Sequence, residues 1–428
     1  MLAPMMGGGQ QQTTDYRVVL PFYVFASISF LAGTGLLWMN TDAIHTHFFN
    51  PHTLAITHIM ALGWGTMIIF GASHQLLPVI LEGKLYSNAL AFLTFVFAAI
   101  GIPVLVTGFY IFHTGWVMQT GAVLTNLGVV CYLANVFSSS YNSKRRGVHA
   151  WYIIAASWWL FLTTGFGLLL VCNFTEMLLP RDSVQYLSVH AHLGIVGWFL
   201  LLVIGVGSRL IPMFLISKYT NEKSLWWIFG LINAGLISFI VFNLAGAPTE
   251  YYYFSVALGL AGILLFGRHC SRAYKMRIRK SVDGQMKTSL VSVFQMLLPI
   301  VALLITLAFL PADRHPNIAL LYGFCIFFGW ITAIILGMTF KTLPFIVWNK
   351  SYHKKAHAGK TPAPKELFDE KVYNAMLVVY LLGFVLFIVG IVAINTVLLQ
   401  LGAAALFVSA VLYLWNTGKT LLHQPNKI

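Results

Sequence analysis

The chain has 428 residues, of which 58% are hydrophobic and only 9% are charged. Soluble domains carry roughly 25% charged residues, so this composition excludes a soluble globular protein and predicts a polytopic membrane protein. The net charge of +14 is concentrated in segments between long apolar runs. It therefore orients helices in a membrane and does not indicate nucleic-acid binding.

Twelve apolar runs are long enough for the roughly 20 residues that a helix needs to cross a bilayer. The prediction is an all-α, polytopic membrane protein with 12 transmembrane helices. The predicted spans are 19–38, 53–81, 88–111, 114–137, 149–171, 186–216, 224–245, 250–267, 289–309, 317–345, 372–395 and 397–417.

The remaining segments define the predicted domain organisation. Residues 1–18 form a polar tail with no cleavable signal peptide, 19–417 form one membrane domain with a linker at 346–371, and 418–428 form a second tail. Lys and Arg gather in alternate loops, mainly 143–146, 268–287 and 341–371. By the positive-inside rule, these loops and both termini are expected in the cytoplasm, and the membrane is expected to be the bacterial inner membrane.

One stretch occurs three times, from His58 to Pro78, from His192 to Pro212 and from Phe324 to Pro344. Aligned without gaps, all three copies share a Gly-Trp pair, a later Gly and the closing Pro. The copies start 134 and then 132 residues apart. This spacing predicts three pseudo-equivalent four-helix units.

Ionisable or metal-ligating residues inside a bilayer are expensive and usually mark function. The second span carries His58 and His74, which are too far apart to share one small ligand. The sixth span opens with His190-Ala-His192, and repeat alignment matches His192 to His58. His52, in the outer loop before the second span, is a further candidate ligand.

Two equivalent imidazoles at one depth are suited to hold haem iron or copper between them. More histidines lie near the same outer end of the spans, namely His45, His47, His113 and His315. The alternatives remain open: each histidine can instead hydrogen-bond a neighbouring helix, and the repeated glycines can serve close helix packing instead of approach to a flat macrocycle. The four cysteines form no CxxC or CxxCH, so a zinc ribbon and covalently attached c-type haem are not expected.

The twelve spans, the triplication and the histidines of spans two and six resemble subunit I of the haem-copper oxidase superfamily. The order His192, Gly205, Pro212 is most similar to the sixth span of the C-type oxidases, where that histidine is a copper ligand. The resemblance implies that His58 is an axial ligand of a b-type haem. The layout also resembles the smaller haem- and copper-containing membrane proteins linked to the nitric oxide response.

Two departures from the oxidases limit the expected activity. Residues 228–244 lack the adjacent histidine pair of the copper site, and residues 320–344 lack the two haem-ligating histidines. We therefore expect haem b or copper bound by His58 and His192, with His190 or His52 as further metal ligands, and no terminal oxidase activity.

The expected roles are electron transfer, nitric oxide handling or metal handling. The expected partners are membrane lipid, other respiratory subunits, or a periplasmic electron-transfer or metal-carrier protein. The alternatives are a non-redox copper- or zinc-handling or transport protein, and a structural subunit without cofactor.

Overall fold

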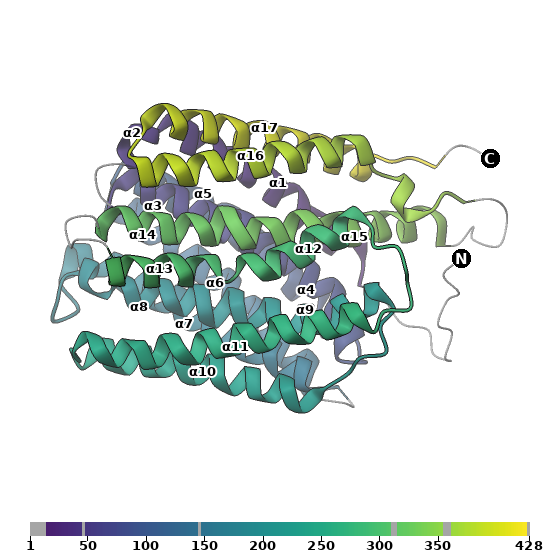
Figure 1. The fold of residues 1–428 in the computed structure, drawn as a ribbon, viewed down its shortest axis with the longest axis horizontal. Coiled ribbons are helices and arrows are strands. Elements are labelled where there is room, and N and C mark those ends of the chain that lie inside the picture. Colours follow the sequence, from purple (N-terminus) through teal and green to yellow (C-terminus); the bar gives the residue numbers. More distant parts are fainter. Residues whose placement is uncertain (1–13, 45–47, 144–146, 310–314, 354–360, 426–428) are drawn as a thin grey trace.

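The computed structural model describes residues 14–44, 48–143, 147–309, 315–353 and 361–425. Within these ranges the chain is helical and has no β-strand, apart from an isolated bridge between Ser217 and Arg277. Twelve of the described helices are long and apolar enough to cross a membrane. The prediction of an all-α polytopic fold is therefore confirmed, and Figure 1 shows the helices running side by side along the longest axis.

The spanning helices follow the predicted order. They are α1 (Tyr16–Met39), α3 with η1 and α4 (Pro51–His58, Ile59–Thr66, Met67–Ile80), α5 (Asn88–Tyr110), α6 (Trp116–Tyr141), α7 (Val148–Glu176), α8 with η3 and α9 (Leu187–His192, Leu193–Leu200, Leu201–Leu215), α10 (Glu222–Leu244), α11 (Thr249–Lys275), α12 with α13 (Gly284–Gln295, Leu298–Phe309), α14 with η5 and α15 (His315–Phe324, Cys325–Ile331, Thr332–Tyr352), α16 (Glu370–Ala393) and α17 (Thr396–Leu421). Short helices α2 (Thr41–Ile44), η2 (Ser183–Tyr186) and η7 (Pro364–Glu366) lie between them.

Several predicted boundaries differ from the structure, and three differences are the clearest. Helix α15 continues to Tyr352 and so includes the first residues of the predicted linker 346–371, and α11 continues to Lys275 instead of ending at 267. A hydropathy window stops at the first basic residues, but Lys and Arg are good helix formers and continue the helix beyond the membrane. The ninth predicted span is broken at Met296 into α12 and α13.

The three repeated stretches share a local irregularity; the first two are continuous helices, and the third is kinked at Gly329, where the backbone is non-helical. The segments η1, η3 and η5 are wider π-helical turns, and each begins directly after the equivalent position occupied by His58, His192 or Phe324. Such π-helical turns are rare and occur often at functional sites. Each contains the Gly-Trp pair of its repeat.

Two hydrogen bonds from buried tryptophans connect these three helices. The indole N–H of Trp64 donates to Thr332 and that of Trp198 donates to Thr66, both at 3.0 Å. The third equivalent acceptor position is Leu200, which has no polar side chain. The bonds run from the first repeat to the third and from the second to the first, and so support the predicted three-unit arrangement, which remains a prediction.

The later glycine of each repeat serves helix packing. A Cβ added at Gly205 would overlap the Tyr152 side chain of α7, and one added at Gly71 would lie 2.9 Å from the Cβ of Phe22 on α1. Of the two interpretations left open by the sequence, close approach of neighbouring helices therefore applies at these positions.

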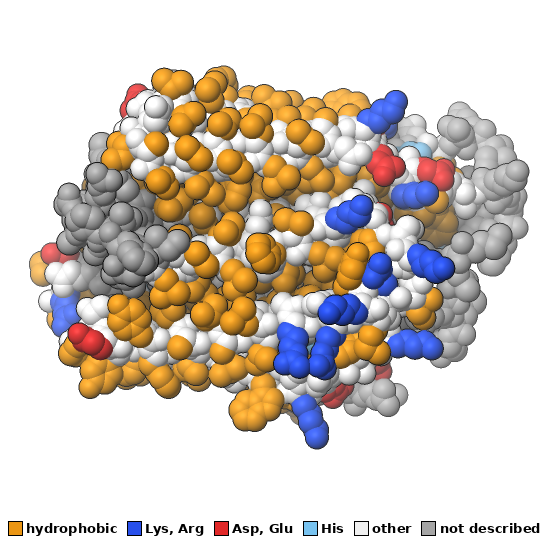
Figure 2. Space-filling view, in the orientation of Figure 1, with side chains coloured by type: hydrophobic (Ala, Val, Ile, Leu, Met, Phe, Trp, Pro, Cys, Tyr) orange, Lys and Arg blue, Asp and Glu red, His pale blue; other side chains and the backbone are white. Residues whose placement is uncertain are grey.

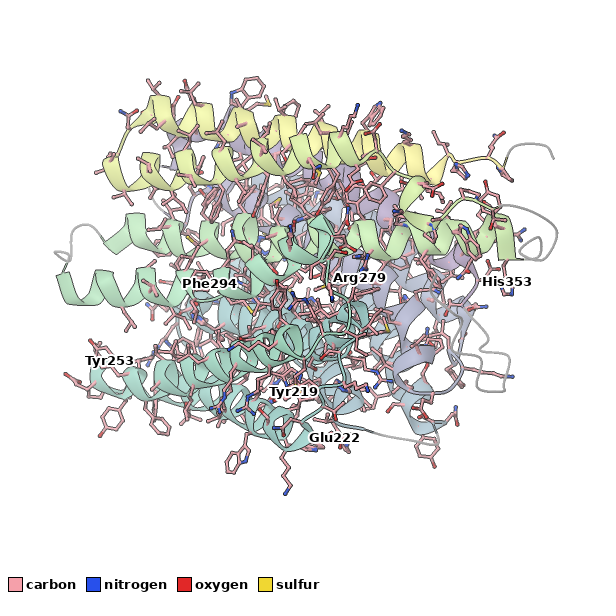
Figure 3. All side chains as sticks on the ribbon, turned by 45° about the vertical axis from the view of Figure 1, so that its right-hand side comes forward. Tyr219, Glu222, Tyr253, Arg279, Phe294 and His353 are labelled. Atoms are coloured by element: carbon pink, nitrogen blue, oxygen red, sulfur yellow. The ribbon has the colours of Figure 1, made fainter. Side chains whose placement is uncertain are left out.

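The two ends of the bundle differ in their content of Lys and Arg. Lys350 lies 5.0 Å above the ring of Tyr16, and the Tyr352 hydroxyl lies 2.8 Å from Nε2 of His423, so α1 begins where α15 and α17 end. In Figure 2, Lys and Arg gather at this same end while the flanks are apolar. Figure 3 places His353 at this end and Tyr253 at the opposite one.

Candidate functional site

A cavity of about 530 Å³ lies among the core helices. Its lining includes residues of α3, α8 and α14, which are the halves of the three repeat helices farthest from the basic end. The cavity wall is mostly apolar and comes mainly from α3, α5, α7, α8, α14 and α16 and from the π-helical segments η1, η3 and η5, with smaller contributions from α1 and α6. Cavities of 300–1,000 Å³ with a few convergent polar groups are typical of small-molecule and cofactor sites. Three imidazoles, those of His58, His190 and His192, line this cavity.

His58 is positioned by its own helix and by a phenylalanine. Its Nδ1 bonds the carbonyl of Leu54 one turn earlier at 2.8 Å, and Phe109 of α5 stacks on its ring at 4.3 Å. A carbonyl partner makes Nδ1 the protonated nitrogen and leaves the Nε2 lone pair free. Metal-ligating histidines typically have this arrangement, because the partner fixes both tautomer and ring orientation.

His190 lies next to His58 in the wall of the cavity. The two ring centres are 6.3 Å apart and the ring planes differ by 22°. On its other side His190 packs on Gly167 of α7, where an added Cβ would lie 2.8 Å from its Cε1. The buried Nδ1 of His190 makes no hydrogen bond with the described residues. An unsatisfied buried polar atom costs about 1–3 kcal/mol.

His192 occupies a different part of the same cavity. Its Nδ1 bonds the carbonyl of Ser188 at 2.8 Å, and its ring contacts Phe239 at 4.4 Å. Its Nε2 lies 3.4 Å from the hydroxyl of Tyr322. Because Nδ1 carries the proton, Tyr322 donates to Nε2. His190 and His192 therefore point in different directions, as residues two apart on a helix do, yet both line one cavity that extends around their helix.

The structure therefore offers an alternative to the predicted pairing of His58 with His192, because the ring that lies 6.3 Å from His58 belongs to His190. The repeat alignment could also have identified Tyr322 as a site residue. When the alignment is extended by two residues toward the N-terminus, Tyr322, which precedes Phe324 by two, aligns with His190, which precedes His192 by two.

The other outer histidines contribute less to the site. His52 packs against Tyr110 at 4.7 Å and is not among the described residues that line the cavity. His113 is exposed. His45 and His47 lie outside the described residues, and the side chain of His315 is likewise outside them.

In the part of the chain that the structure describes, no three His, Cys, Asp or Glu side chains gather closely enough to hold a metal ion. Structural zinc sites use four protein ligands and catalytic ones use three. A closed zinc or copper centre built from His52, His58, His190 and His192 together is therefore not assembled by the described residues.

The other half of the bundle holds His74 and His269. The His74 ring lies 5.6 Å from Phe22 and 5.5 Å from Tyr132, and His74 does not line the large cavity. His269 of α11 is 3% exposed and contacts Tyr219. His269 was missed in the sequence because the predicted span ended at 267. Neither residue joins the cluster at the large cavity.

No family model and no curated protein matches this chain by sequence. The functional conclusion therefore rests on the residues of the cavity.

Proposed function

We propose that this chain is a bacterial inner-membrane protein that holds b-type haem, or copper, in the 530 Å³ cavity near its outer face. Its role is electron transfer, nitric oxide handling or metal handling, and not terminal oxidation. The resemblance to haem-copper oxidase subunit I is part of this proposal.

The single observation that carries the proposal is the convergence of three imidazoles on one apolar cavity. Two of them, His58 and His192, have Nδ1 bound to a backbone carbonyl, so the lone pair of each ring is on Nε2; in His192 this atom accepts from Tyr322. Neutral imidazole is the side chain that haem iron and copper most often use. A bilayer interior disfavours polar groups without a partner, so the free Nε2 of His58 and the Nδ1 of His190, which is unpaired among the described residues, support a ligand-binding role.

The residues present fit haem better than a protein-only metal site. No group of three or more protein ligands gathers among the described residues, and a porphyrin supplies four nitrogen ligands of its own. If bound, haem would supply a one-electron couple and a site for a diatomic gas. The chain would supply the imidazoles that hold it and apolar walls, including Phe109 and Phe327, that exclude water.

The orientation follows from the charge at the two ends. Segment 268–287 carries seven Lys and Arg and only Asp283 as an acid. This end is placed in the cytoplasm by the positive-inside rule, which puts the cavity near the periplasm. A periplasmic electron-transfer or metal-carrier protein, or another respiratory subunit, would reach it there.

The test is the optical spectrum and metal content of the purified full-length protein. We expect a Soret band that is lost or strongly reduced in His58→Ala, whereas His113→Ala keeps it because that exposed residue lies outside the cavity. Stoichiometric copper in the purified protein without a Soret band would identify copper, and not haem, as the bound group. Absence of both haem and copper would refute the proposal.

A further inference from the structure

The three cavity histidines are not equivalent, and their contacts divide them into two groups. His58 and His190 face each other, and the hydroxyl of Tyr322 caps His192. We propose that His58 and His190 are the two protein ligands of one metal ion placed between their rings, with His192 and Tyr322 forming a separate polar pair in the same cavity. This inference rests on the proposed function and names the second ligand.

The distance between the rings matches a shared ion. A metal–imidazole nitrogen bond is about 2.0–2.1 Å, and a ring nitrogen lies about 1.1 Å from its ring centre. Two imidazoles on opposite sides of one ion therefore have centres roughly 6.2–6.4 Å apart. The observed separation of His58 and His190 is 6.3 Å, with planes 22° apart.

The available nitrogens agree with this assignment. The bond from His58 Nδ1 to Leu54 leaves Nε2 of His58 free. His190 has no competing partner at Nδ1 among the described residues, and its ring is held by packing on Gly167. Nε2 of His192 is the one that already accepts a hydrogen bond, at 3.4 Å from the Tyr322 oxygen. A ligand at His192 would have to displace that hydroxyl.

Two metal sources share this chemistry. Haem iron takes two axial imidazoles and four porphyrin nitrogens, and copper(I) takes two imidazoles alone. The experiment separates the two sources by the presence or absence of a Soret band.

The test compares His190→Gly with His192→Gly in purified full-length protein, by optical spectroscopy and electron paramagnetic resonance. For haem, we expect the wild type to be low-spin, His190→Gly to become high-spin or lose the haem, and His192→Gly to stay low-spin. Free imidazole added to His190→Gly should restore the low-spin spectrum, a rescue that a purely structural role would not give.

Gly167 provides a second variant that leaves every histidine in place. Gly167→Ala puts a methyl group 2.8 Å from Cε1 of His190 and should shift the spectrum as His190→Gly does. Gly165→Ala is the matched control on the same helix, because its nearest neighbour, Asn126 Nδ2, is 3.7 Å away. Size-exclusion profiles identify variants that fail to fold. If His190→Gly fails to fold, the comparison of Gly167→Ala with Gly165→Ala tests the proposed pairing instead.

The outcomes separate the two proposals. Haem that depends on His58 and His192 but not on His190 would overturn the pairing and leave the proposed function intact. If no Soret band is present, copper(I) is titrated, and at least a tenfold weaker binding is expected in both His58→Ala and His190→Gly. Equal binding in those variants and the wild type, or no binding in any of them, would also overturn the pairing.

Discussion

The hydrogen bonds from tryptophan to threonine between the core helices predict a specific energetic coupling. Trp198 is 1% exposed and Thr66 is 2% exposed, and the bond between them is 3.0 Å long. Trp198→Phe removes the donor and Thr66→Val removes the acceptor. Hydrogen bonds between transmembrane helices average about 0.6 kcal/mol and reach about 1.7 kcal/mol. Because both partners are buried and the bond has the ordinary length of an N–H···O hydrogen bond, we expect a coupling in the upper part of this range, about 1–1.7 kcal/mol.

A double-mutant cycle isolates this term from the volume lost when Trp becomes Phe. The assay is unfolding of the detergent-solubilised protein by sodium dodecyl sulfate, followed by circular dichroism. The second bonded pair, Trp64 with Thr332, should give a similar coupling. The swapped pair, Trp198→Phe with Thr332→Val, joins no bonded partners and should be additive within about 0.3–0.5 kcal/mol. Bonded and swapped cycles with equal coupling energies would refute the reasoning.

Two further predictions concern helix packing and charge. Gly205→Ala should destabilise the protein by about 1–3 kcal/mol in the same unfolding assay, because the added Cβ overlaps a tyrosine of α7. The control is Gly230→Ala, which has open space around it and should be neutral or slightly stabilising. Asp283→Ala should cost about 2–4 kcal/mol, because Asp283 caps α12 and pairs with the partly buried Lys341. Asp369→Ala removes a cap of the same kind with a more exposed ion pair and should cost less; a larger loss at Asp369 would contradict this account.

Much of the fold was predictable because a bilayer imposes long apolar helices. The twelve spans follow from length and composition alone, and the repeat identified three of the helices that line the cavity. Boundaries such as Tyr352 were harder to predict, since hydropathy marks where the membrane ends and not where the helix ends.

The site was only partly predictable for a geometric reason. The sequence identified His58, His190 and His192 as candidates, and all three line the cavity. It favoured His192 by repeat equivalence, which treats the units as identical. The unit-specific contacts support the pairing with His190 that we propose: Gly167 on α7 leaves room for the ring of His190, and the hydroxyl of Tyr322 on α14 lies 3.4 Å from Nε2 of His192. Such contacts between distant segments are not encoded in the spacing within one helix.

The most direct test of the central claim is anomalous X-ray diffraction from crystals of the full-length protein, with data collected at the iron and copper absorption edges. The account predicts one strong peak at one of these edges, between the rings of His58 and His190 and about 2 Å from a nitrogen of each. A peak bound by His192 and not by His190, or a cavity without any anomalous peak, would contradict it.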